Sequence, residues 1–208
     1  MKRGYYYSTV LGLLCLAIAA AGLLQERFEA QVESTNNQLA ALLAPYDGIE
    51  ATFDSPTKTS GCTSNGPLPD PDCSPGAIFA SSTVEDICTP GYSSSVRNVS
   101  VSLKKKIYGE YGLTYPQPTG SYEVDHIIPL ELGGSNDRAN LYPEAAEPAP
   151  GFHEKDIVED YLHQEVCAGH IELSAAQQQI ANDWIAVYRI LSTTDIQNIK
   201  SKFHNWAD

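Results

Sequence analysis

Residues 122–142 read YEVDHIIPLELGGSNDRANLY, and this stretch decides the fold expected for the chain. Its first residues, from Tyr122, alternate apolar and acidic side chains, as a half-buried strand does. The double glycine that follows allows the chain to reverse, and Asn140 then precedes a second apolar pair. The stretch therefore predicts a β-hairpin that carries an acid and an imidazole, Asp125 and His126, side by side at the end of its first strand.

The two neighbouring side chains Asp125 and His126 have complementary chemistry. A carboxylate binds a hard cation, and an imidazole accepts a proton from water when it is held in one tautomer. Hydrolysis of a phosphodiester at neutral pH needs a base of this kind and a cation that neutralises charge on the phosphate. Asn140 is expected to pin the intervening loop through its amide. For His126 taken alone, the alternative is a histidine that only caps a turn.

The pattern D-H-I-I-P-L-x-x-G-G-S-N-D-x-x-N-L, over residues 125–141, resembles the HNH (ββα-metal) endonuclease motif. The resemblance covers roughly residues 70–190. Three further segments are similar to exported bacterial HNH-type domains: C-x-P-G-Y-x-x-x-V-R from Cys88, K-D-x-x-E-x-x-L-H-x-x-V-C from Lys155, and A-Q-x-x-I-x-x-D-W from Ala176. The implied fold is α+β, with a ββα-metal (HNH-like) hairpin-plus-helix core, C-terminal helices behind it and disulfide-stapled N-terminal loops.

The resemblance also implies roles for individual residues. Asp125 is expected to be a metal ligand, His126 the general base, and Asn140 the residue that orients the catalytic loop. The expected activity is cleavage of DNA, with RNA as the alternative, at low sequence specificity. The expected cofactor is a divalent metal, with Mg²⁺ favoured and Mn²⁺ or Zn²⁺ as alternatives.

The second metal ligand is left open by the sequence. HNH proteins take it from the helix after the second strand, often as an asparagine just before the K-D pair, and this chain departs from that pattern near Gly151. His153 is the expected substitute, because the first helical turn lies closest to the hairpin. The alternatives are Asp156, Glu159 and His163, which share one face of the same helix.

The charge of the chain bears on its partner. It has 13 Lys+Arg against 26 Asp+Glu and a formal net charge of −13, so its overall field does not attract nucleic acid. The concentrated positive charge is the run Lys104, Lys105 and Lys106, to which Arg97 and Arg138 are expected to add. These five side chains are the expected contacts to substrate phosphates. A solvated helix face is the alternative for the lysine run.

Residues 1–24 combine a basic start with a run of roughly 16 apolar residues, which is typical of an export signal. The run is shorter than the ~20 residues of a membrane span, which favours a cleaved peptide. An uncleaved anchor through residues 9–24 is the alternative. The protein is therefore expected to be secreted, periplasmic or membrane-anchored facing outside. Residues 25–70 are expected to form a linker or stalk, and residues 71–208 the HNH-like domain.

Four cysteines follow the apolar run, namely Cys62, Cys73, Cys88 and Cys167. An even set in an exported chain predicts two disulfides, with three possible pairings. A zinc site is the alternative, although the chain has no C-x-x-C pair.

Two other functions compete with the nuclease. One is an exported, non-catalytic binding module on the same scaffold, favoured by the net charge and by the departure near Gly151. The other is a toxin-type nuclease, which implies an immunity protein as its partner.

Overall fold

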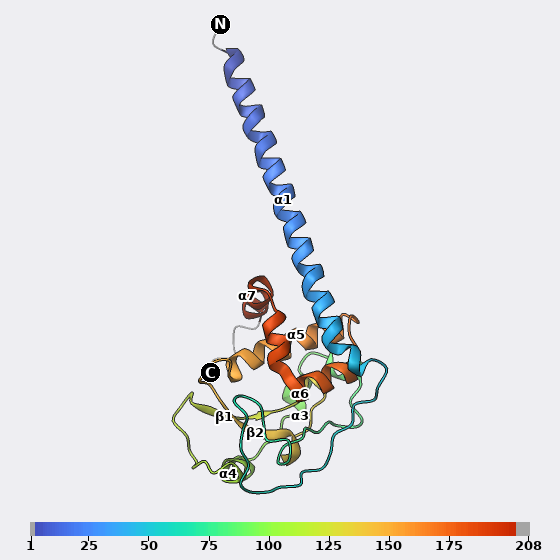
Figure 1. The fold of residues 1–208 in the computed structure, drawn as a ribbon, viewed down its shortest axis with the longest axis vertical. Coiled ribbons are helices and arrows are strands. Elements are labelled where there is room, and N and C mark those ends of the chain that lie inside the picture. The colour runs from blue at the N-terminus through green and yellow to red at the C-terminus, as the bar shows by residue number, and fades with distance from the viewer. Residues whose placement is uncertain (1–2, 203–208) are drawn as a thin grey trace. The chain divides into compact units, whose positions relative to one another are not determined.

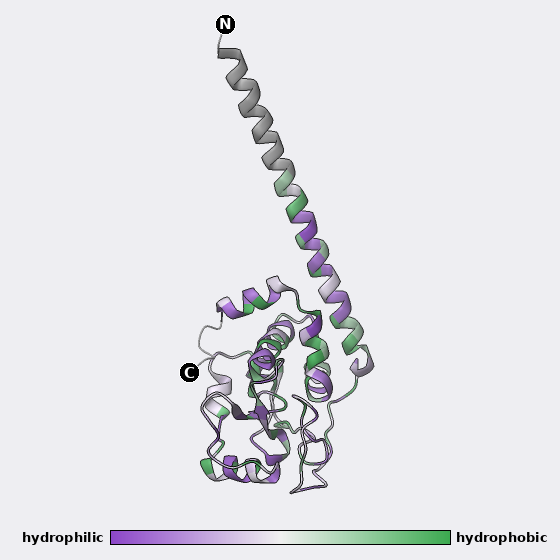
Figure 2. Cartoon of the chain, turned by 60° about the vertical axis from the view of Figure 1, so that its left-hand side comes forward, coloured by the Kyte–Doolittle hydropathy of each residue, from purple (hydrophilic) through white to green (hydrophobic). Residues whose placement is uncertain are grey.

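The computed structural model describes the backbone of residues 3–202 and the side chains of residues 20–202. The chain divides into two compact units, residues 1–39 and residues 40–208. Helix α1 (Arg3–Leu43) runs through the first unit. The expected export signal or anchor, residues 1–24, lies mostly outside the residues whose side chains are described. In the described part of the chain, no helix has an apolar stretch long enough to cross a membrane. Beyond Leu24, α1 mixes hydrophilic and hydrophobic residues (Figure 2).

The second unit is α+β, as expected (Figure 1). Within the described residues, its sheet consists of strands β1 (Tyr122–His126) and β2 (Leu141–Ala145). Three helices precede the hairpin: α2 (Val84–Ile87), α3 (Tyr92–Val96) and α4 (Val101–Glu110). Three more follow it: α5 (Phe152–Cys167), α6 (Leu173–Ile190) and α7 (Thr193–Lys202). Short 3-10 turns lie at Ala44–Tyr46, Leu130–Leu132 and Arg138–Asn140.

The predicted hairpin is confirmed. The two strands are antiparallel, with Asp125 opposite Tyr142 and His126 opposite Leu141. Because the side chains of successive strand residues point to opposite faces, the side chains of Asp125 and His126 point to different faces of the hairpin. The strand pair therefore gives these two sequence neighbours different surroundings.

The hairpin lies between two helical layers. Helix α4 packs against both strands, and Figure 1 shows α5 and α6 on the other side of the hairpin. Helices α5 and α6 pack on each other through apolar stripes. The buried members include Ile157, Val158 and Leu162 of α5, and Ile180, Trp184 and Val187 of α6. Each such side chain contributes roughly 1.5–3 kcal/mol when it is fully buried, so these stripes fix α5 against the rest of the unit.

The four cysteines form two disulfides, Cys62–Cys73 and Cys88–Cys167. The first staples a loop ahead of the hairpin. The second joins the end of α2 to the end of α5, across a sequence separation of 79 residues. The predicted disulfides are thus confirmed, and they indicate an oxidising compartment.

The disulfide Cys88–Cys167 has a histidine beside it. Ligand atoms of Cys88, His163 and Cys167 lie within 4.8 Å of one another. The two sulfur atoms are joined in the disulfide, so neither is a free thiolate that can bind zinc. His163 Nε2 lies 3.0 Å from the backbone oxygen of Ile87. His163 is therefore held at the disulfide end of α5.

Candidate active site

Asp125 lies on the face of the hairpin that meets α5, where Lys155 binds it. Lys155 Nζ donates to Asp125 Oδ2 at 2.6 Å and to the backbone oxygen of His126 at 2.7 Å. It also forms an ion pair with Glu159, one turn further along α5. The side chain of Lys155 is only 1% exposed. A buried ammonium group thus sits among three oxygen atoms at the end of β1.

The charges of this group stabilise one another. Burial acts to raise the pKa of Asp125, but the positive charge of Lys155 outweighs it and holds that pKa below its ordinary value. Burial acts to lower the pKa of Lys155, and the charges of Asp125 and Glu159 outweigh it and hold that pKa well above its ordinary value. Asp125 is therefore ionised and Lys155 protonated at neutral pH.

His126 is buried on the opposite face of the hairpin, and Asn136 holds its ring. His126 Nε2 lies 3.3 Å from Asn136 Oδ1. Asn136 Nδ2 donates to the backbone oxygen of Val96 at 2.7 Å, and its Oδ1 accepts from the backbone nitrogen of Asn98 at 3.0 Å. Since the amide oxygen faces the ring, Nε2 is the protonated nitrogen and Nδ1 carries the lone pair. Burial lowers the pKa of His126 to about 4, although the charge of Asp125 opposes this shift.

Asn140 pins the loop between the strands. Its side chain is fully buried, accepts from the backbone nitrogen of Ile128 at 2.9 Å, and donates to the backbone oxygen atoms of Ile128 at 2.8 Å and Ser135 at 2.9 Å. Gly134 belongs to the same arrangement, because a Cβ there would lie 1.7 Å from the Ile128 oxygen and 2.9 Å from Asn140 Nδ2. The amide therefore does what the sequence predicted for it, and it fixes the backbone that follows His126.

Further carboxyl groups surround the buried ammonium. Burial raises the pKa of Glu123 to about 7 and that of Asp156 to about 8, and the charge of Asp125 adds to both shifts. Burial raises the pKa of Glu159 well above its ordinary value, against the charge of Lys155. One lysine thus lies among several acids, and any added cation in this region meets a negative field.

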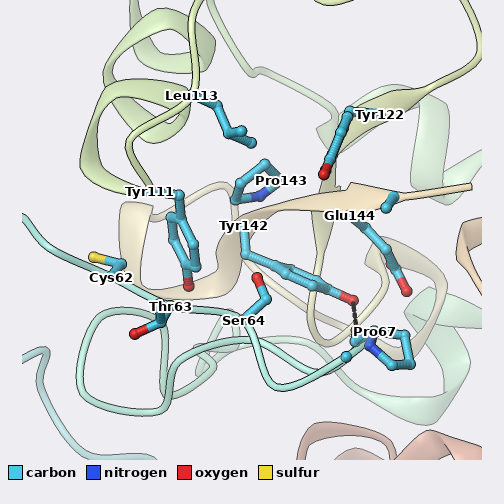
Figure 3. A pocket seen from close by; sticks show the side chains of 12 residues that line it. Cys62, Thr63, Ser64, Pro67, Tyr111, Leu113, Tyr122, Tyr142, Pro143 and Glu144 are labelled. Carbon is cyan, nitrogen blue, oxygen red and sulfur yellow. Dashed lines mark hydrogen bonds between the residues drawn. The ribbon is translucent and has the colours of Figure 1, made fainter. Parts of the chain in front are cut away.

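Glu144 on β2 differs from the other acids because nothing donates to it. It is 1% exposed, and neither carboxylate oxygen has a hydrogen-bond donor. The Tyr142 hydroxyl lies near Glu144 and acts to lower its pKa, but it donates to the backbone oxygen of Pro67 at 3.0 Å (Figure 3). The carboxylate of Asp125 also lies near, and Glu144 can bond with it only as the protonated acid. Burial raises the pKa of Glu144 well above its ordinary value, against the charge of Lys155.

The expected positive contacts separate into two groups. The charges of Arg97 and Lys104 both lower the pKa of Glu123, and the charge of Arg97 also lowers the pKa of His126. These two positive charges therefore lie near the candidate site. Lys105 lies over the ring of Tyr115, 5.5 Å from its centroid, and Lys106 is exposed on α4.

Arg138, one of the five expected phosphate contacts, is held in an ion pair within the protein. Its Nε donates to both carboxylate oxygens of Glu110 at 2.8 Å, and its Nη2 donates to the backbone oxygen of Lys58 at 2.8 Å. The side chains of this ion pair are mostly buried, at 16% exposure for Arg138 and 6% for Glu110. Arg138 therefore joins a loop to α4, and we remove it from the expected phosphate contacts.

The four candidates for the second metal ligand, His153, Asp156, Glu159 and His163, do not share one location in the structure. His153 is exposed and its ring packs on Phe152, with ring centroids 4.2 Å apart. His163 lies at the disulfide end of α5. Glu159 shares Lys155 with Asp125, and Asp156 acts electrostatically on the same group. The geometry thus favours the acids of α5 over the expected His153, because the interior face of the helix carries acids and its first turn points His153 to solvent.

Sequence reasoning missed three residues of this arrangement: Lys155, Glu144 and Asn136. A signal existed for Lys155, because it stands three residues before Val158 and seven before Leu162, which places a charge on the apolar stripe of the helix. Glu144 and Asn136 had no comparable signal, since both look like ordinary strand and turn residues.

No family model, curated protein or solved structure matches the chain. The resemblance to HNH endonucleases therefore rests on the motif residues themselves.

Proposed function

We propose that this protein is an exported, divalent-metal-dependent endonuclease of the HNH type that hydrolyses phosphodiester bonds of nucleic acid. The observation that carries the proposal is the pair at the end of β1: an imidazole held in one tautomer and, on the other face of the strand, an ionised carboxylate, with the loop after them pinned by Asn140. A base and a cation ligand fixed in this way are what hydrolysis of a phosphodiester requires.

His126 takes the role of general base. Its lowered pKa keeps the ring unprotonated at neutral pH, and the bond to Asn136 leaves Nδ1 as the atom that accepts a proton from the attacking water. A base with a low pKa is weak, so the product imidazolium needs stabilisation. The charge of Asp125 supplies it, because that charge raises the pKa of His126.

The residues present fit a hard divalent cation. The donor atoms around Asp125 are carboxylate oxygens, which Mg²⁺ prefers, and two buried oxygens of Glu144 lack a partner. Asp125 is the expected ligand. When bound, the cation would neutralise charge on the scissile phosphate and on the leaving oxygen.

Arg97 and Lys104 supply the local positive charge that an acidic protein needs to approach a polyanion. Both act on Glu123, two residues before Asp125 on β1. The backbone on either side of Arg97 is tied to Asn136, which also holds His126. We infer that Arg97 and Lys104 contact phosphates next to the scissile bond.

The exported location belongs to the same proposal. The disulfides and the basic-then-apolar start of the chain support a protein that acts outside the cytoplasm, either released or anchored through residues 9–24.

The second candidate is a non-catalytic binding module, and two observations favour it. Lys155 already donates to Asp125, so an ammonium group holds an oxygen that a metal ion would use. His126 is 3% exposed, which restricts the approach of a substrate.

The two candidates differ in a cleavage assay on the purified full chain. Supercoiled plasmid and a single-stranded RNA are incubated with Mg²⁺, Mn²⁺ or Zn²⁺, with and without chelator, beside His126→Ala. His170→Ala is the matched control, because His170 is an exposed histidine with a side chain 63% exposed. We expect metal-dependent cleavage by the wild type and by His170→Ala, and its loss in His126→Ala. Cleavage by His126→Ala at the wild-type rate would contradict the assignment of the base, and no cleavage by the wild type with any of the metals would favour the binding module.

A further inference from the structure

Two cysteines and a histidine, Cys88, Cys167 and His163, meet at the end of α5, and their ligand atoms all lie within 4.8 Å of one another. His163 and Cys167 stand four residues apart on α5, so they share one face of the helix. Cys88 follows the last residue of α2 and approaches that face from the other helix. Thiolate sulfur and imidazole nitrogen are the ligands that Zn²⁺ takes in proteins, so the three residues have the composition of a zinc site once the disulfide is open.

The disulfide Cys88–Cys167 is the more accessible of the two disulfides. Cys167 is exposed and Cys88 is partly exposed, whereas Cys62 and Cys73 are buried at 5% and 0% exposure. Thiol–disulfide exchange requires a thiolate to reach a sulfur atom, so a dithiol reductant opens Cys88–Cys167 before Cys62–Cys73. The exchange passes two electrons and two protons to the cysteines, which become two thiols, and the dithiol leaves as its own disulfide.

The reduced pair has the spacing that a zinc ion needs. The Cα atoms of Cys88 and Cys167 lie 5.7 Å apart. In a tetrahedral site with Zn–S distances of ~2.3 Å, two sulfur atoms lie about 3.8 Å apart, which rotation of two short side chains can reach.

The ring of His163 is already oriented as a ligand. Its Nε2 lies 3.0 Å from the backbone oxygen of Ile87. A backbone oxygen only accepts, so Nε2 carries the proton and Nδ1 keeps the lone pair that a metal ion needs. Histidines that bind metals donate their other ring nitrogen to a backbone oxygen or a carboxylate in the same way.

We propose that Cys88, Cys167 and His163 bind one Zn²⁺ when the disulfide is reduced, with water as the fourth ligand. Both thiols lose their protons as the ion binds, and the two thiolates balance its charge. Coordination then replaces the covalent link between α2 and α5, so α5, which carries Lys155, stays joined to α2 under reducing conditions. The inference does not rest on the proposed nuclease, because the three ligands take no part in the candidate active site.

The inference is tested with Co²⁺, which occupies tetrahedral zinc sites and absorbs in the near ultraviolet when thiolates bind it. The full chain is reduced with a phosphine and titrated with Co²⁺ beside the oxidised chain. We expect the thiolate band at one ion per reduced chain, and its loss in Cys88→Ser. His163→Gln should weaken Co²⁺ binding by roughly tenfold or more, which corresponds to about 1.4 kcal/mol. His170→Gln, whose side chain is 63% exposed, and the double variant Cys62→Ser/Cys73→Ser are the controls expected to keep the band.

Thermal unfolding of the same samples shows whether the folded protein holds the ion. Reduction lowers the melting temperature, and Zn²⁺ should restore part of the loss by binding the folded state. This rise is expected in the wild type and in His170→Gln, and it should shrink in His163→Gln. An ion bound at Asp125 acts on the oxidised and reduced forms alike, so the rise is measured as the difference between them.

Three results would overturn the inference. The first is a reduced wild type without a thiolate band. The second is a band that persists at full strength in Cys88→Ser, because other thiols then bind the ion. The third is equal binding by His163→Gln and His170→Gln, which would show that the ion does not use the histidine, whether or not the reduced chain is folded.

Discussion

Replacing Lys155 by methionine removes the one ammonium group among the buried acids and keeps much of the side-chain volume. The change leaves Asp125 and Glu159 without their cation and the backbone oxygen of His126 without its donor. Breaking a buried ion pair by removing one partner costs about 3–5 kcal/mol. The two acids retain 14% and 15% exposure, which places the expected loss near the lower value, roughly 3 kcal/mol. For a chain of this length, that lowers the melting temperature by roughly 6–12 °C.

The assay is thermal unfolding of the full chain with chelator present, followed by circular dichroism across a pH series. Lys106→Met serves as the control, because Lys106 is exposed on α4. Without Lys155, the pKa of Asp125 loses the charge that holds it down, and the pKa of Glu159, which burial already raises, rises further. The folded variant therefore binds protons that the unfolded chain does not. The loss relative to the wild type should therefore shrink as the pH falls through the raised pKa values.

Two results would refute this reasoning. One is a Lys155→Met protein whose melting temperature equals that of Lys106→Met. The other is a loss that stays constant with pH, because the acids then do not depend on Lys155 for their charge.

Three further predictions concern the scaffold. Asn140→Ala leaves two backbone oxygens and a backbone nitrogen of the loop without partners, and it should lower the free energy of unfolding by about 2–4 kcal/mol in urea titration; a loss below 1 kcal/mol would contradict the pinning role. Because the pKa of His126 is lowered, the unfolded chain binds a proton at a higher pH than the folded chain does, and the contribution of His126 to the free energy of unfolding is lost as the pH falls from about 6.5 toward 4. The difference in the free energy of unfolding between wild type and His126→Gln should decline over that range. A difference that does not change with pH would contradict the lowered pKa. Removing Cys88–Cys167 by double serine substitution should lower the free energy of unfolding by about 4.5 kcal/mol, because this disulfide closes a loop of 79 residues. Removing Cys62–Cys73, which closes a loop of 11 residues, should lower it by about 2.8 kcal/mol. Equal losses measured by calorimetry would contradict the loop-closure account.

The hairpin was predictable because its signals are local. Alternation, the double glycine and the placement of Asn140 all lie within about twenty residues, and strand pairing follows from them. The two disulfides followed from the number of cysteines, while their pairing did not, because it depends on which loops the fold brings together.

The composition of the site was less predictable, since it depends on how α5 faces the hairpin. The sequence places His153 closest along the chain, but the helix turns Lys155 and Glu159 inward and His153 outward. Which side of a helix meets a strand is decided by packing across the whole unit. Glu144 was missed for a related reason: a glutamate on an edge strand usually faces water, and only the tertiary structure buries it.

The disulfide between α2 and α5 makes the candidate site part of a covalent ring. Cys88 and Cys167 bracket the hairpin, Arg97 and Lys155 within one closed loop of chain. A single cut by a protease anywhere in this loop opens the ring without releasing a fragment, so the pieces stay joined and their burial can hold them in register. For a protein expected to work outside the cell, among proteases, such a ring makes the assembly of base, acid and ammonium tolerant of one broken peptide bond.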